Sequence, residues 1–130
     1  MNSTPNNDVL ARTIDSFNRR EYDEAANLTN TMLQDVVGKD ELFWLGMSEA
    51  CRGFSLIMGG ELRKSQPLMV AAMEKLRNFG YRHQNLEITS VLAGLRRGIE
   101  ESTMVLNKDK RVFDLSLLPK LKMSARADNR

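Results

Sequence analysis

The chain has 130 residues, of which 42% are hydrophobic and 28% are charged, and its formal net charge is +2. This length is typical of one domain with its own core, and so small a net charge gives by itself no argument for a nucleic-acid or membrane partner. The single cysteine, Cys51, excludes an internal disulfide bond, and no cluster of His and Cys residues indicates structural zinc.

No stretch of the sequence has the composition of a membrane span or of a signal peptide. No run approaches the ~18 consecutive apolar residues that a spanning helix needs. The start of the chain, MNSTPNNDV, lacks the basic and apolar regions of a secretory signal. We therefore expect a cytoplasmic protein that makes no membrane contact.

The first two predicted helices follow a polar segment. Residues 1–7 contain a proline and no hydrophobic period, so we expect a flexible tail there and a helical domain over residues 8–106. Asn7 or Asp8 is expected to cap the first helix, whose apolar residues have helical spacing: Leu10, Ile14 and Phe17. The second helix is predicted over residues 22–37 and should end at Gly38. Its apolar face comprises Ala25, Leu28, Met32 and Val36.

The third predicted helix, residues 41–58, is the most apolar segment and is expected to be central to the bundle. Each glycine costs a helix about 1 kcal/mol relative to alanine, so Gly46 and Gly53 indicate the close approach of another helix. The two glycines at 59 and 60 should end the helix. Its polar side chains share the remaining face: Ser48, Glu49, Arg52 and Ser55.

The fourth predicted helix lies within residues 62–80. Pro67 should either occupy its first turn, with Ser65 as the cap, or kink the helix. Gly80 is expected to close it, and YRHQN, residues 81–85, to form a loop.

The fifth predicted helix, residues 86–106, has the clearest amphipathic pattern. Its apolar face opposes a charged solvent face with Arg96, Arg97, Glu100 and Glu101.

No segment of the sequence has a convincing strand pattern. The predicted fold is therefore all-α: a single-domain bundle of about five helices with short loops and a docked, partly extended C-terminal tail.

Residues 107–130 form a basic C-terminal tail. It contains seven Lys or Arg and three Asp, so its charge of +4 leaves −2 for the rest of the chain. Pro119 prevents one continuous helix. We expect residues 112–121 to dock on the bundle, because their large apolar side chains are too numerous to stay exposed, and the tail to fray beyond Leu121.

The basic side chains of this tail are candidates for contact with an acidic partner, with nucleic acid as a further possibility. The alternative is a solubilising terminus with no partner. The candidate contact residues are Lys108, Lys110, Arg111, Lys120 and Lys122.

The sequence offers little for catalysis, and we assign no catalytic, metal or cofactor residue. His83 is the only histidine, in a polar segment, and Cys51 lies within an apolar helix, as a small core residue would. RNFGYRH, residues 77–83, resembles the arginine-histidine motif of HEPN-type ribonucleases. In such a site Arg77 would stabilise a phosphate and His83 would act as acid or base. Gly80 between them is expected to break the helix that would hold both.

A polar pocket between the second and third helices is a second candidate site for a small ligand or for catalysis. Glu49 and Arg52 are spaced i,i+3, and a buried charge must be paired. If they face inward, they would line a pocket with Asn27 and Asn30 of the second helix. If they lie at the edge of the helix, they form an exposed pair.

Four segments in order resemble the bacterial and archaeal domain-of-unknown-function family numbered 309. They are FNRREYDEAANLTNTML, FWLGMSEACRGF, GGELRKSQPLMVAAMEKL and LEITSVLAGLRRGIE. The resemblance covers about residues 14–101 and implies a small helical bundle without an established activity.

The chain departs from that family along the second helix. The family typically carries histidine, acidic residues and tryptophan there, whereas this chain has Ala26, Asn27, Asn30 and Leu33 in the corresponding register. A metal or acid-base role inferred for the family's polar set therefore does not transfer to this chain.

The absence of a convincing catalytic set favours a non-enzymatic domain that binds a protein partner or associates with itself, without a cofactor. The eight methionines and Trp44 add large apolar side chains that suit a binding surface, although most should lie in the core. The alternatives are the pocket between the second and third helices and the ribonuclease.

Overall fold

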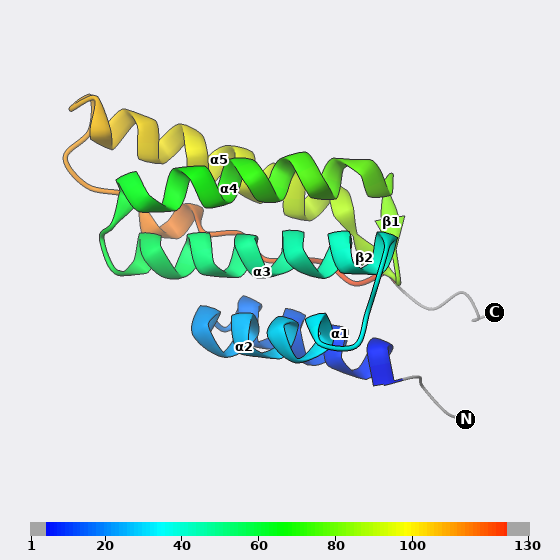
Figure 1. Cartoon of the computed structure of the whole chain (residues 1–130). Coiled ribbons are helices and arrows are strands. Elements are labelled where there is room, and N and C mark those ends of the chain that lie inside the picture. The colour runs from blue at the N-terminus through cyan, green and yellow to red at the C-terminus, as the bar shows by residue number, and fades with distance from the viewer. Residues whose placement is uncertain (1–4, 125–130) are drawn as a thin grey trace.

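The computed structural model describes residues 5–124 and confirms the all-α fold (Figure 1). Five helices account for most of this range: α1 (Pro5–Asn18), α2 (Tyr22–Leu33), α3 (Lys39–Met58), α4 (Leu62–Leu76) and α5 (Ile88–Leu106). The shorter elements are the 3-10 turns η1 (Arg77–Phe79) and η2 (Leu115–Leu117) and the strands β1 (Arg82–His83) and β2 (Leu86–Glu87).

Helix α3 is the central element, as its apolar sequence predicts. It packs against α2 on one side and α4 on the other, α1 packs against α2, and α5 packs against α4. Figure 1 shows the resulting layers, with α1 and α2 below α3 and with α4 and α5 above it. The largest fully buried side chains include Trp44, Phe43 and Phe54 of α3 and Phe17 of α1.

Two glycines allow α3 and α4 to pack closely, which confirms the prediction for both. A Cβ atom on Gly46 would lie 2.9 Å from Cγ of Leu76, and one on Gly53 would lie 2.7 Å from Cγ of Met69. Both distances are shorter than van der Waals contact, so a side chain at either position would push the helices apart.

The ends of the first two helices differ from the prediction. Helix α1 begins at Pro5, because proline is favoured in the first turn of a helix; the predicted flexible tail otherwise lies outside the described residues. Helix α2 ends at Leu33, before Val36 and Val37, whose β-branched side chains disfavour helix. Gly38 has φ +67° and precedes α3 instead of closing α2.

Helix α4 begins at Leu62, so Ser65 lies inside it and is not its cap. The Ser65 hydroxyl donates a hydrogen bond to the Leu62 carbonyl at 2.8 Å. Pro67 also lies inside the helix, beyond the first turn. The helix gives way to η1, and Gly80 follows with φ +74°.

The predicted loop after Gly80 is a small hairpin, which the sequence analysis missed. Strand β1 pairs with β2 in antiparallel register, with His83 opposite Leu86. The two residues between them, Gln84 and Asn85, both have positive φ, 51° and 69°. A two-residue turn with positive φ at both positions matches the twist of the strands it connects. Leu86 and Glu87 are thus in a strand, and α5 begins at Ile88.

Three helices end in one common way, with a left-handed residue just beyond the helix. In α5 that residue is Lys108, with φ 68°. Its amide donates to the Val105 carbonyl at 3.0 Å, and the Asp109 amide donates to the Met104 carbonyl at 2.8 Å. This is the Schellman arrangement, and the corresponding residues after α1 and α3 are Arg20 and Gly60.

Candidate binding groove between α5 and the C-terminal tail

The C-terminal tail docks on the bundle, antiparallel to α5. Pro119 lies against Gly94, where a Cβ atom would be 2.6 Å from Cβ and Cγ of the proline. Only glycine therefore fits at position 94. Leu118 and Leu121 of the tail are buried in the core, as the prediction of a docked tail requires.

Asn18 at the end of α1 holds the extended part of the tail. Its side-chain amide donates to the Leu121 carbonyl at 3.0 Å, and its side-chain oxygen accepts from the Leu121 amide at 2.7 Å. One Asn side chain thus satisfies both backbone groups of Leu121. The Lys120 ammonium donates to the Asn18 carbonyl at 2.8 Å. The tail therefore closes the bundle between α1 and α5.

Residues 122–124 of the tail pair with the hairpin. The Glu87 amide donates to the Lys122 carbonyl at 2.8 Å, and the Ser124 amide donates to the Asn85 carbonyl at 2.6 Å. The prediction that the tail frays beyond Leu121 is wrong for these three residues. Residues 125–130 lie outside the described part of the chain.

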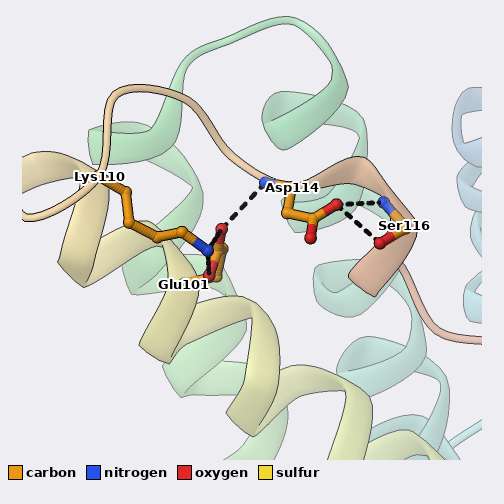
Figure 2. A network of polar contacts seen from close by, with 4 residues as sticks. All are labelled: Glu101, Lys110, Asp114 and Ser116. Atoms are coloured by element: carbon orange, nitrogen blue, oxygen red, sulfur yellow. Dashed lines mark hydrogen bonds and ion pairs between the residues drawn. The ribbon is translucent and has the colours of Figure 1, made fainter.

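A buried carboxylate anchors the beginning of the tail (Figure 2). Glu101 of α5 is 4% exposed, although the sequence analysis placed it on the solvent face. Its oxygens accept hydrogen bonds from Lys110 at 2.8 and 3.0 Å and from the Asp114 amide at 2.9 Å. Asp114 in turn accepts from the amide and hydroxyl of Ser116. The tail itself covers Glu101, which no helical pattern within α5 could reveal.

This anchor makes a testable prediction about acid. The hydrogen bonds from Lys110 and from the Asp114 amide hold the pKa of Glu101 below its ordinary value. Its contribution to stability is therefore present above the pKa of an unfolded glutamate, about 4.3, and is lost as the pH falls through the lower folded value. We expect urea unfolding of Glu101→Gln to show a smaller loss of stability between pH 7 and pH 3 than that of the unsubstituted protein. Equal losses would contradict an ionised anchor.

A groove of about 310 Å³ lies between α5 and the docked tail. Residues Ser90, Ala93, Gly94 and Arg97 line it from one face of α5, and residues 116–120 and 122 line it from the tail. Its lining includes three cations, Arg97, Lys120 and Lys122, and no Asp or Glu. Within residues 5–124 none of the three cations is in an ion pair. The groove can therefore accept an anionic group.

The tail cations predicted to make a common contact have different surroundings. Lys110 forms an ion pair with Glu101, and the Lys120 ammonium donates a hydrogen bond to the Asn18 carbonyl. Lys122 is at the groove, whereas Lys108 and Arg111 are exposed in the segment that follows α5.

Arg97 of α5 lines the groove with Lys120 and Lys122, but the sequence pattern did not identify it. Its spacing of three and seven residues from Gly94 and Ser90 puts all three on one helical face, but only the docked tail makes that face a groove wall.

The four residues of the predicted pocket between α2 and α3 are not brought together. Glu49 faces α4, where Lys75 Nζ lies 2.9 Å from its Oε1 atom. Asn30 accepts a hydrogen bond from Ser48 at 3.3 Å, and Asn27 is exposed. Arg52 is exposed and lines a separate small surface cavity with Asp23.

The residues of the ribonuclease-like motif are in different elements. Arg77 is exposed in η1, and His83 is in β1 beyond Gly80. The His83 ring packs on Phe43 and Phe79, with centroid distances of 4.6 and 4.8 Å, and burial lowers its pKa. The histidine is thus a member of an aromatic cluster.

Cys51 is fully buried in α3, and burial raises the pKa of its thiol to about 12. Such a thiol is a poor nucleophile near neutral pH, because the reactive form is the thiolate. Within residues 5–124 no group of three or more His, Cys, Asp or Glu residues is arranged to hold a metal ion.

Comparisons with protein-family models, with curated proteins and with solved structures found no match to this chain. None of the helices in the described part of the chain is both long enough and apolar enough to cross a membrane.

Proposed function

We propose that this protein is a non-enzymatic binding domain and that an acidic segment of a partner protein occupies the groove between α5 and the tail. The observation that carries the proposal is that three cations and no carboxylate line the groove. Charges of one sign on a concave surface attract a segment of the opposite sign and orient it.

The shape and lining of the groove favour a protein segment over nucleic acid. Its lining also includes five residues that offer apolar contact: Ala93, Gly94, Leu117, Leu118 and Pro119. An acidic segment with interspersed apolar side chains matches this mixture. Nucleic-acid binding commonly uses many phosphate contacts along an extended basic surface, and three cations around a short groove provide few of them.

The relation to the domain-of-unknown-function family numbered 309 is also our proposal. It is supported by the positions that carry the resemblance: Tyr22, Ala25 and Gly46 are all buried at helix contacts. A cytoplasmic location is proposed in the same sense, and the reduced, buried Cys51 is compatible with it.

Binding of a short peptide of glutamate and leucine residues tests the function. We expect saturable binding that weakens with salt and that falls about tenfold or more in Arg97→Glu/Lys122→Glu, because attraction becomes repulsion at two points. The matched control is Arg12→Glu/Arg77→Glu, which changes two exposed cations elsewhere and should leave the affinity nearly unchanged.

Two outcomes of this experiment would contradict the proposal. One is equal loss of affinity in both double variants, which would indicate a response to net charge alone. The other is a single-stranded oligonucleotide that binds the same groove more tightly than the peptide, which would replace the protein partner with nucleic acid.

A further inference from the structure

A second surface, separate from the groove, lies at the end of the bundle where the α3–α4 turn meets the end of α5. Four large apolar side chains are exposed there or on the adjoining tail: Met58, Met104, Val112 and Leu115. Val112 is 73% exposed. In Figure 1 the segment after α5, drawn in orange, lies at the same end as the α3–α4 turn. We refer to this surface, together with Lys108 and Arg111, as the turn-end patch.

Two cavities flank the α3–α4 turn within this patch. One, of about 440 Å³, lies between the start of α4 and the end of α5, and its lining includes Leu62, Val105 and Leu106. The other, of about 560 Å³, lies between the start of α2 and the end of α3, beside Met58. Glu61 lines both cavities, so they lie on either side of the turn.

The larger cavity is acidic, and the exposed tail segment at the same end carries two cations, Lys108 and Arg111, against one exposed carboxylate, Asp109. Four carboxylates line the cavity, Glu21, Asp23, Glu24 and Glu61, against one cation, Arg20. Asp23 and Glu24 are in no ion pair with the described residues, and the same holds for Lys108 and Arg111. The turn-end patch thus presents both unpaired signs of charge together with exposed apolar side chains.

We propose that the turn-end patch binds the turn-end patch of a second copy of this chain. In a two-fold dimer each surface contacts the same surface of its partner, so a patch must be complementary to itself. A patch with a basic, apolar projection beside an acidic cavity meets that condition, because each copy can place its projection against the other's cavity. Exposed methionines, which adapt to an opposing surface, suit such a contact.

Sedimentation equilibrium of the full chain, from micromolar to near-millimolar concentration, tests the dimer. We expect a monomer–dimer equilibrium, and we expect Val112→Asp to raise the dissociation constant about tenfold or more by placing a carboxylate against the acidic cavity. Val37→Asp is the matched control, since Val37 is 82% exposed on the segment between α2 and α3 and the variant should dimerise as the unsubstituted protein does. Circular dichroism should show both variants folded, because both side chains point into solvent.

Three outcomes would overturn the inference: a monomer throughout, a stoichiometry other than two, or equal disruption by the two variants. The results of the dimer experiment and of the peptide-binding experiment can be told apart. A monomer that still binds the acidic peptide overturns the dimer alone, and a dimer that fails to bind it overturns the groove alone.

Discussion

Deletion of residues 112–130 is expected to lower the free energy of unfolding by about 3 kcal/mol. The deletion exposes the core that Leu118 and Leu121 cover, and burial of one leucine contributes about 1.5–3 kcal/mol. The conformational entropy of the freed tail offsets part of this loss. Urea unfolding followed by circular dichroism measures the difference between the two chains.

A shorter deletion, from residue 122 onward, is the control. It removes the backbone pairing of Lys122 and Ser124 with the hairpin but leaves both buried leucines, so we expect a cost of about 1 kcal/mol. If the longer deletion costs no more than the shorter one, the tail is not part of the core.

The second large effect is expected at the contact between α3 and α4. A Cβ atom on Gly53 would lie 2.7 Å from Cγ of Met69 and 3.6 Å from the Ser65 carbonyl oxygen. Gly53→Val adds two further carbons at this point, and overpacking of a core typically costs about 1–3 kcal/mol. We expect a loss near the upper end of that range, because Cγ of Met69 is already too close to the first added carbon.

Gly59→Ala is the matched control for this substitution. Gly59 has φ −83° and its nearest neighbours would lie 3.7 Å from a new Cβ atom, which is ordinary contact. The unfolding midpoint of the Gly59→Ala protein in urea should stay close to that of the unsubstituted protein. If Gly53→Val leaves the free energy of unfolding unchanged, α3 and α4 do not approach as closely as described.

The helical part of the fold could be predicted because its signals are local. Apolar spacing identified all five helices, and the two glycines of α3 indicated the close approach of another helix without showing which one. Helix ends were less predictable. Gly60 ends α3 as a glycine is expected to, but Arg20 and Lys108 occupy the same left-handed position after α1 and α5. Their identity gives no such signal, since the conformation is imposed by hydrogen bonds to the preceding turn.

The hairpin and the groove could not be predicted, because both depend on contacts distant in sequence. Two-residue strands are too short to show an alternating pattern. Glu101 and Arg97 both lie on the charged face of α5 in the helical pattern. The docked tail buries Glu101 and turns the surface beside Arg97 into a groove wall. The basic tail was recognised from its charge, but its path along α5 was not.

A heteronuclear NMR titration with the glutamate–leucine peptide tests the central claim most directly, because it locates binding residue by residue. The claim predicts saturable amide shift changes concentrated at Ser90, Gly94 and Arg97 of α5 and at residues 116–118, 120 and 122 of the tail. It predicts none of comparable size when glutamine replaces glutamate in the peptide. Shift changes that spread over all basic surfaces, that map to another face of the bundle, or that persist with the glutamine peptide would contradict a binding groove between α5 and the tail.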